Sequence, residues 1–216
     1  LGALGVFLVG MKMMSEGLQK VAGAQLKKMV RTVTGNRFSG VLTGLAVTCA
    51  VQSSSAATVM VVSFVTAGLL TLTQAIGVIM GANIGTTVTG WLVALLGFKV
   101  KITAFALPAV GFGFGMTFLR GARRKQIGET LIGFGLLFLG LSLLKSAVPD
   151  VEGEQLAWVA RFSDGSFLSM IIFVGIGSVL TVLLQSSSAT MTLTLTLAAL
   201  GVLPYELAAA MVLGEN

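Results

Sequence analysis

The phrase Gln-Ser-Ser-Ser occurs twice in this chain, at residues 52–55 and 185–188, and each copy interrupts a long apolar run. Four adjacent hydrogen-bonding side chains are costly to bury in hydrocarbon unless they have partners. The chain must therefore fold so that protein or water surrounds both phrases. Because the two phrases are equivalent, we expect a single binding site built from both halves of the chain.

The composition indicates a protein that crosses a membrane several times. Of the 216 residues, 55% are hydrophobic and 10% are charged, whereas soluble domains have about 25% charged residues. Histidine is absent, which excludes the usual zinc, haem and Ser-His-Asp chemistries, and the single cysteine, Cys49, excludes an internal disulfide. The chain does not begin with methionine and residue 216 interrupts a motif, so we expect a fragment that forms one functional unit.

The sequence around the two phrases is repeated. Residues 48–58 align with 181–191 at an offset of 185 − 52 = 133, and the same offset places Gly81-Ala82-Asn83 over Gly214-Glu215-Asn216. Upstream, residues 4–10 resemble 134–140 at an offset of 130. Chance serine clusters would not bring a matching glycine and asparagine downstream, so the pattern predicts two structural repeats.

The first phrase is predicted to form the tip of a helical hairpin. Residues 38–70 are too few for two crossings, which need about 40 apolar residues, and the phrase lies near their middle. This stretch therefore predicts a re-entrant hairpin that enters the membrane and returns. Residues 74–97 predict a crossing that is broken at Asn83–Thr87, between Gly81 and Gly85.

The segment before the first hairpin begins as an apolar helix at residues 1–14. Residues 15–36 carry lysines and an arginine, with apolar residues at roughly helical spacing. This pattern predicts an interfacial amphipathic helix or a cytoplasmic connection, with a solvated loop as the alternative.

The rest of the chain predicts a linking crossing followed by the same elements again. In order, these are a crossing at 102–119 with a kink at Pro108, a basic cytoplasmic loop at 120–125, a crossing at 126–147, a polar connection at 149–165, a second re-entrant hairpin at 167–202 and a second broken crossing from Pro204. Residues 1–101 would then form the first repeat, 102–125 the link, and 126–216 the second repeat, truncated at its end.

The connections that precede the two hairpins carry opposite charge. Residues 15–37 hold five basic residues and one acidic residue, a net charge of +4, whereas 145–166 hold two basic and four acidic residues, a net charge of −2. Because basic segments tend to stay in the cytoplasm, the hairpins are predicted to enter from opposite faces. The predicted fold is an all-α polytopic membrane protein with inverted-topology repeats, two re-entrant helical hairpins and broken transmembrane helices, which is typical of secondary transporters.

The tips predict a site for an anion and a cation. Serines before an apolar run are good helix N-caps, so each tip is expected to hold a helix N-terminus, which favours anions. Amide and hydroxyl oxygens and unwound backbone carbonyls are ligands suited to sodium. Neither hairpin core contains an acidic or basic residue, so a divalent anion would need co-transported cations. The competing interpretation is structural, with these groups joining helices by hydrogen bonds.

The doubled Gln-Ser-Ser-Ser-Ala phrase and the stretch Gly81-Ala82-Asn83-Ile84-Gly85-Thr86-Thr87 resemble the signature of the type II sodium-dependent inorganic phosphate cotransporters. The resemblance covers nearly the whole chain and implies sodium-coupled import of phosphate across the cytoplasmic membrane by alternating access. It implies sodium as the co-transported ion, no organic cofactor, and the lipid bilayer as surroundings. A homodimer and a C-terminal regulatory domain outside this chain are compatible with it.

The resemblance also assigns site residues. Phosphate binding between the two tips is implied for Gln52, Ser53, Ser54, Ser55, Gln185, Ser186, Ser187 and Ser188. Sodium binding is implied for Gln52, Ser55, Asn83, Thr86, Thr87, Gln185, Ser188, Thr190 and Asn216. One departure is Glu215, which stands where the first repeat has Ala82 and could bind sodium, accept a proton or pair elsewhere.

Other functions share part of this pattern. A channel shares the composition, but two discrete polar tips favour binding and release. A sodium-coupled carrier of a dicarboxylate or an amino acid also uses serine-rich hairpins, yet usually needs a cationic partner, which is not evident here. An intramembrane serine protease would need Lys12 or Lys145 as its base, and snorkelling at helix ends explains both more simply, so we expect no enzyme. A phosphate sensor would bind without transport, and the basic cluster 120–125 is interpreted as a topological anchor rather than a nucleic-acid site.

Overall fold

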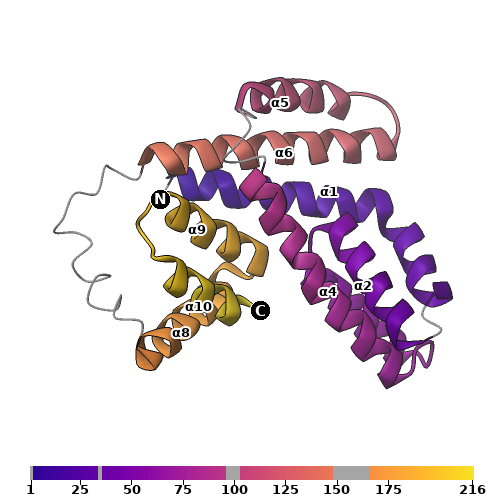
Figure 1. Cartoon of the computed structure of the whole chain (residues 1–216). Coiled ribbons are helices and arrows are strands. Elements are labelled where there is room, and N and C mark those ends of the chain that lie inside the picture. The colour runs from indigo at the N-terminus through magenta and orange to yellow at the C-terminus, as the bar shows by residue number, and fades with distance from the viewer. Residues whose placement is uncertain (1, 34–35, 96–102, 148–165) are drawn as a thin grey trace. The chain divides into compact units, whose positions relative to one another are not determined.

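A computed structural model of the chain describes residues 2–33, 36–95, 103–147 and 166–216 (Figure 1). The helices are α1 (Gly2–Val33), α2 (Arg37–Val51), α3 (Ser54–Thr66), α4 (Leu72–Leu92), α5 (Thr103–Thr117), α6 (Ala122–Ala147), α8 (Phe167–Leu184), α9 (Ser187–Ala199) and α10 (Tyr205–Glu215). These described ranges contain no strand, so the all-α prediction is confirmed. The chain forms two compact units, Leu1–Gly140 (unit 1) and Leu141–Asn216 (unit 2).

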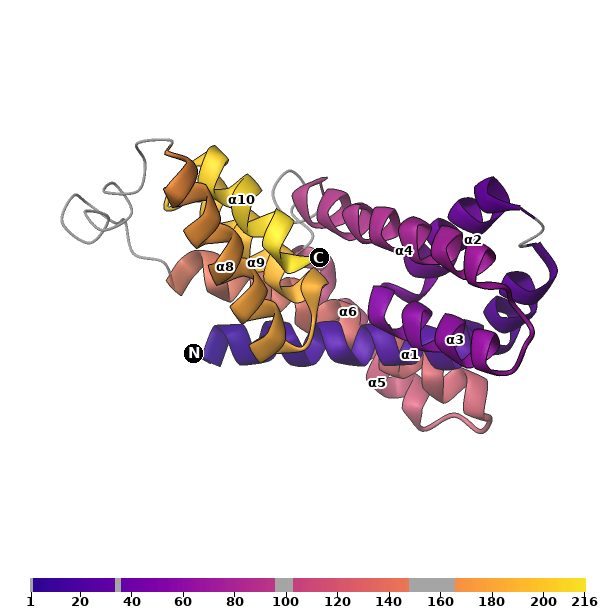
Figure 2. The same cartoon turned by 90° about the horizontal axis from the view of Figure 1, so that it is seen from below.

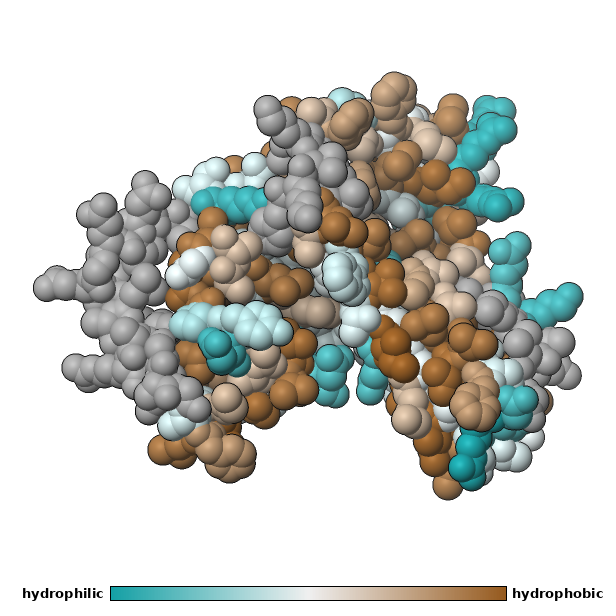
Figure 3. Space-filling view, in the orientation of Figure 1, coloured by the Kyte–Doolittle hydropathy of each residue, from teal (hydrophilic) through white to brown (hydrophobic). Residues whose placement is uncertain are grey.

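Three of the described helices are long and apolar enough to cross a membrane. They are Leu72–Leu95, Ala122–Ala147 and Phe167–Leu184. Large hydrophobic side chains are exposed along Leu72–Leu95, Phe167–Leu184 and α5, and at Leu143 of α6, and apolar residues form much of the surface in Figure 3. Such apolar surface is costly in water and favourable in lipid, which fits a membrane protein.

In unit 1, α2 and α4 lie side by side along their length (Figure 1 and Figure 2). A Cβ atom on Gly44 of α2 would collide with the Val78 carbonyl of α4, and one on Gly81 of α4 would collide with the Val41 carbonyl of α2. Small residues at such positions let two backbones approach closely, which increases their van der Waals contact in lipid. A buried apolar cluster that includes Val78 of α4 and Val61 of α3 adds α3 to the packing of α2 against α4.

Unit 2 packs its hairpin on α10 through the equivalent residues. A Cβ atom on Gly177 of α8 would collide with the Met211 carbonyl, and one on Gly214 of α10 would collide with the Val174 carbonyl. All four positions follow from those of unit 1 by the offset of 133. The repetition seen in the sequence is therefore also a repetition of helix bounds and helix contacts.

Helices α1 and α6, which correspond at the offset of 130, contact each other within unit 1. Gly10 lies against the backbone of Leu137, and Gly140 lies against the backbone of Phe7. Position 10 corresponds to 140 and position 7 to 137, so each of these two contacts is the counterpart of the other at the offset of 130. The residue numbers rise along one helix as they fall along the other, so α1 and α6 run antiparallel.

The predicted boundary near Ser15 is wrong, because α1 continues as one helix through Val33. Residues 15–33 are therefore helical, and the alternative of a solvated loop is excluded for them. This segment contains no proline, and Gly17 is accommodated because it lies against Thr130 of α6. An ion pair between Lys20 and Glu129, with an N–O distance of 3.3 Å, also joins the two helices.

The predicted break at Asn83–Thr87 is also wrong. Helix α4 runs without interruption through this stretch and continues as a π-turn to residue 95. Gly81 and Gly85 do not interrupt the helix, because their missing side chains make room for α2, with Gly85 against Thr48. Residues 96 and 97 of the predicted crossing lie outside the described part.

The link between the repeats differs in detail from the prediction. Helix α6 begins at Ala122, so Arg123, Arg124 and Lys125 form its first turns and only the preceding residues form the loop. Pro108 lies inside α5, whose 15 residues are fewer than the roughly 20 of a full crossing. Residues 96–102, before α5, and the predicted polar connection at 149–165 lie outside the described residues.

Candidate functional site

Both Gln-Ser-Ser-Ser phrases form the same helix–break–helix tip. Gln52 ends α2 with φ 57° and Gln185 ends α8 with φ 55°, and these are the only residues other than glycine with positive φ in the described ranges. Left-handed backbone at a non-glycine residue costs about 1 kcal/mol or more and is concentrated at functional sites. The tips are therefore candidates for a functional site on backbone geometry alone.

A serine caps the second helix of each hairpin, as predicted. The Ser53 hydroxyl accepts a hydrogen bond from the Ala56 amide at 3.2 Å, and the Ser186 hydroxyl accepts one from the Ala189 amide at 3.3 Å. The first amides of α3 and α9 have no carbonyl partner inside their helices, as at any helix N-terminus. Each tip thus presents backbone N–H groups and a partial positive charge beside serine hydroxyls.

The Gln52 side chain is 9% exposed and is held inside unit 1. Its amide nitrogen donates to the Cys49 carbonyl at 2.7 Å, and its amide oxygen accepts from the Thr89 hydroxyl of α4 at 2.9 Å. The tip is also joined to α1, because the Ser15 hydroxyl donates to the Val51 carbonyl at 3.2 Å. Gln52 therefore positions the first tip against α4.

A cavity of about 870 Å³ opens beside the first tip in unit 1. Ser53 and Ser55, whose hydroxyl oxygens are 3.2 Å apart, line it together with Glu16 and Gln19 of α1. Glu16 is the charged residue among its described lining, and its carboxylate lies 3.9 Å from the Lys12 ammonium. The cavity therefore combines helix N-terminal amides, hydroxyls and one carboxylate, a set that can hold an anion together with cations.

The predicted sodium ligands of α4 differ in their exposure. Thr86 is buried and donates to the Ala82 carbonyl, whereas Thr87 is exposed and donates to the Ile84 carbonyl. Asn83 is exposed on the same helix. The two threonine hydroxyls bond within α4, whereas the hydroxyl of Thr89, which was not predicted as a site residue, donates to Gln52 of the first tip.

The second tip is enclosed differently from the first, because Gln185 is exposed whereas Gln52 is buried. Ser188 is buried, whereas its counterpart Ser55 is exposed. Gln185 donates to the Val182 carbonyl at 2.7 Å, as Gln52 does to Cys49. Beside the tip, the buried Thr190 hydroxyl donates to the Ser186 carbonyl at 3.0 Å, while Asn216 is exposed.

Glu215 hydrogen-bonds within unit 2. Its carboxylate accepts a hydrogen bond from the Thr194 hydroxyl of α9 at 2.5 Å, and its side chain is buried. Of the three predicted roles, pairing is thus present, and it leaves the second carboxylate oxygen without a hydrogen-bond partner.

Sequence reasoning missed the contribution of α1 to the site. Ser15 and Gln19 are four residues apart on this helix, and the Gln19 amide donates to the Ser15 hydroxyl at 3.1 Å. With Lys12, Glu16 and Lys20 they form a polar stripe at helical spacing. The stripe was hidden because residues 1–14 and 15–36 were interpreted as separate segments, and the spacing would have revealed it in one continuous helix.

Comparisons with known proteins identify similar sequences. A family model described as Na+/Pi-cotransporter matches residues 6–146. YjbB of Salmonella typhimurium, whose name refers to the export of inorganic phosphate, is 30% identical over 221 residues, covering 100% of this chain and 39% of that protein. The uncharacterized protein YqeW of Bacillus subtilis is 31% identical over 97% of this chain and 66% of its own length.

A mammalian protein matches a shorter part. The sodium-dependent phosphate transport protein 2A of Rattus norvegicus is 42% identical over 100 residues, which are 44% of this chain and 15% of that protein. The chain spans about two fifths of the length of the YjbB proteins that it matches. No solved structure matches the chain.

Proposed function

The chain belongs to the Na+/Pi-cotransporter family, and on that premise we propose that it imports inorganic phosphate across the cell membrane together with sodium. Phosphate would be held between the two Gln-Ser-Ser-Ser tips near the bilayer midplane and released by alternating access. The observation that carries the proposal is the matched geometry of the tips, each with a left-handed glutamine followed by a serine-capped helix N-terminus. The family is one of transporters, which accords with the expectation that the chain is not an enzyme.

The phosphate ligands follow from the chemistry of the tips. Backbone amides at a helix N-terminus and serine hydroxyls both donate hydrogen bonds to phosphate oxygens. We assign this role to Ser53, Ser54 and Ser55 in the first tip and to Ser186, Ser187 and Ser188 in the second. Gln52 and Gln185 would hold the backbone turn, and the remaining hydrogen-bonding groups of their side-chain amides would be available to phosphate.

Sodium coupling follows from charge. The cavity beside the first tip contains Glu16 and no lysine or arginine among its described lining residues. A phosphate dianion would therefore be held by two helix termini, equivalent to about half a positive charge each, and the remaining charge needs cations. Hydroxyl and amide oxygens are ligands that suit sodium. We assign sodium binding to Gln52, Ser55, Asn83, Thr86, Thr87, Gln185, Ser188, Thr190 and Asn216.

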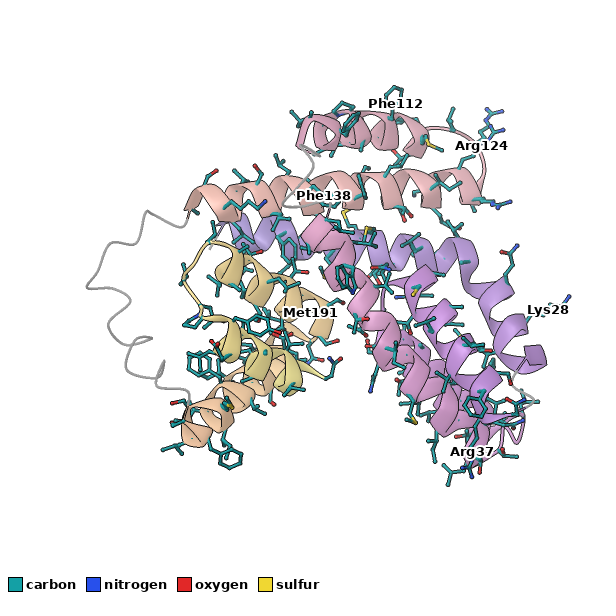
Figure 4. All side chains as sticks on the ribbon, viewed as in Figure 1. Lys28, Arg37, Phe112, Arg124, Phe138 and Met191 are labelled. Carbon is teal, nitrogen blue, oxygen red and sulfur yellow. The ribbon has the colours of Figure 1, made fainter. Side chains whose placement is uncertain are left out.

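Alternating access is supported by the antiparallel contact of α1 and α6. Inverted repeats require their equivalent helices to run in opposite directions, and Gly10 and Gly140 exchange places across that contact. Figure 4 adds that the labelled basic residues Lys28, Arg37 and Arg124 all lie toward one end of unit 1. By the positive-inside tendency, this end would face the cytoplasm.

Phosphate export is the second candidate. It is favoured by the name of YjbB, which matches the whole chain, whereas the name of protein 2A refers to sodium-dependent phosphate transport. A coupled carrier moves its substrate in the direction that the combined gradients dictate. The direction therefore depends on the sodium and phosphate gradients, and transport with imposed gradients separates the two candidates.

The test is radiolabelled phosphate flux in liposomes that contain the purified protein. We expect an inward sodium gradient to drive phosphate uptake, and replacing sodium with choline to abolish it. Ser53→Ala and Ser186→Ala should each lower the uptake, whereas Ser146→Ala, in an exposed turn of α6, is the control and should not. Uptake without sodium would contradict the coupling, and efflux that ignores the sodium gradient would favour export by another mechanism.

A further inference from the structure

The two units differ at one buried position pair. In unit 1, Val61 of α3 and Ala82 of α4 are both buried in the same apolar cluster. At the offset of 133, these positions are Thr194 and Glu215 in unit 2, which form the hydrogen bond between α9 and α10. A polar, acidic pair has therefore replaced an apolar pair inside an otherwise equivalent arrangement of helices.

A neighbouring pair of positions is also more polar in unit 2 than in unit 1. In unit 2, the Thr181 hydroxyl donates to the Thr190 hydroxyl at 3.2 Å. In unit 1 the equivalent pair is Thr48 and Ala57, and the buried Thr48 hydroxyl has no hydrogen-bond partner. Thr190 and Thr194 are four residues apart and share a face of α9, so the hydroxyls and the Glu215 carboxylate form one polar seam in unit 2.

Glu215 is not neutralised by any described neighbour in unit 2. Its side chain is 3% exposed, and the Oε2 atom has no hydrogen-bond partner. The sequences of α8, α9 and α10, which pack together, contain neither lysine nor arginine, and the other titratable residues of these helices are Tyr205 and Glu206 at the opposite end of α10. A buried carboxylate without a counter-charge is strongly unfavourable, so this group must be neutralised by a proton or by a bound cation, and the unpartnered Oε2 leaves an oxygen available for a cation.

We propose that the Glu215 carboxylate and the Thr194 hydroxyl form a sodium site in the second repeat that the first repeat lacks. Carboxylate and hydroxyl oxygens are hard ligands that suit an alkali cation, and the unpartnered Oε2 supplies a free lone pair inside the seam. The Thr194 hydroxyl donates its proton to Oε1 and keeps its own lone pairs for the ion. This inference rests on the proposed sodium coupling and locates one of the coupled ions in unit 2.

The test measures sodium binding without transport. The thermal unfolding midpoint of the purified protein is followed over a sodium chloride series in which choline chloride keeps the ionic strength constant. A ligand that binds only the folded state raises the midpoint, so the concentration needed for a given rise reports affinity. We expect Glu215→Gln and Thr194→Val each to need about tenfold more sodium than the wild type, or more.

The matched controls come from the first repeat. Val61→Thr introduces at the equivalent position the hydroxyl that unit 1 lacks, and its sodium response should equal that of the wild type. The double variant Thr194→Val/Glu215→Ala copies the apolar pair of unit 1, so it should fold even if Glu215→Gln does not, and its midpoint should rise less with sodium than that of the wild type. An unchanged sodium requirement in Glu215→Gln, or a sodium response in the double variant equal to that of the wild type, would overturn the proposal.

Phosphate flux distinguishes this inference from the proposed function. If flux is independent of sodium while Glu215→Gln still needs about tenfold more sodium for the same rise in midpoint, the coupling fails and the site stands. If flux requires sodium and Glu215→Gln changes neither its sodium dependence nor the midpoint series, the coupling stands and the site is refuted.

Discussion

Gly81 of α4 lies directly on the backbone carbonyl of Val41 in α2, with no room between them for a Cβ atom. Its counterpart, Gly214, meets Val174 in the same way. A glycine within a motif that also carries candidate ligands therefore determines how closely each hairpin approaches the next helix. The closeness matters for the site, because the same two helices carry Gln52 and Thr89.

Gly81→Ala should destabilise unit 1. The added methyl group must displace backbone rather than a flexible side chain, and overpacking of this kind costs about 1–3 kcal/mol or more. We expect a lower thermal midpoint in detergent. Gly115→Ala on α5 is the control, because no atom lies within 4 Å of its added Cβ, and it should raise the midpoint slightly through helix propensity. Equal midpoints for the two variants would contradict the packing role.

Thr89→Val should loosen the first tip while preserving the shape of α4. The change removes the hydroxyl that donates to the Gln52 amide oxygen and should cost about 1 kcal/mol. We expect faster hydrogen exchange at the amides of residues 53–57, measured by mass spectrometry. Thr87→Val is the matched control, because that exposed hydroxyl bonds within its own helix. Unchanged exchange in Thr89→Val would show that Gln52 is held by other contacts.

The serine N-caps should affect both the stability of the protein and phosphate binding, through the helix N-terminus that each serine caps. Ser53→Ala removes the acceptor for the Ala56 amide, whereas Ser53→Gly preserves a good N-cap residue, and the two differ in capping by about 0.5–2 kcal/mol. Both remove the hydroxyl from the cavity. We therefore expect Ser53→Ala to lower the thermal midpoint more than Ser53→Gly, and both to raise the KM for phosphate. A KM equal to that of the wild type in both variants would indicate a purely structural serine.

Cysteine labelling should locate the two hairpin entrances on opposite faces of the membrane. Cys49 is the single cysteine, so Cys49→Ala provides a background for Lys28→Cys, Arg124→Cys and Phe167→Cys. A membrane-impermeant maleimide applied to intact cells should spare the first two and label the third, because basic segments favour the cytoplasmic face. Labelling of all three from one side would contradict the inverted repeat.

Local signals in the sequence were sufficient for the helix breaks at the two phrases and for the caps that follow them. Polar residues that interrupt an apolar run, followed by more apolar residues, predicted the break at Gln52 and the cap at Ser53, because N-capping depends on residues only a few positions apart. The doubled motif predicted that residues 185–188 would do the same. The offset of 133 then held for the ends of α2 and α8, for the bounds of α3 and α9, for the starts of α4 and α10, and for the glycine contacts.

The role of Gly81 and Gly85 depended on tertiary structure. Within a helix, glycine is compatible with a break or with close packing, and the choice depends on whether another helix lies against it. Because α2 does, α4 stays continuous where a break was expected. The polar stripe of α1 shows the same dependence, since Glu16 and Gln19 belong to the site only because α1 passes beside the first tip.

The sequence by itself determined the membrane class, the repeated motif, the helix breaks and the caps, because these follow from composition, from spacing and from neighbours along the chain. The tertiary structure decided which polar groups meet. Gln52 with Thr89 and Thr194 with Glu215 are separated by 37 and 21 residues. The first hydrogen bond forms where glycine contacts bring α2 and α4 together, and the second forms where α9 packs on α10. Long-range polar pairs depend on that packing, and no local pattern encodes it.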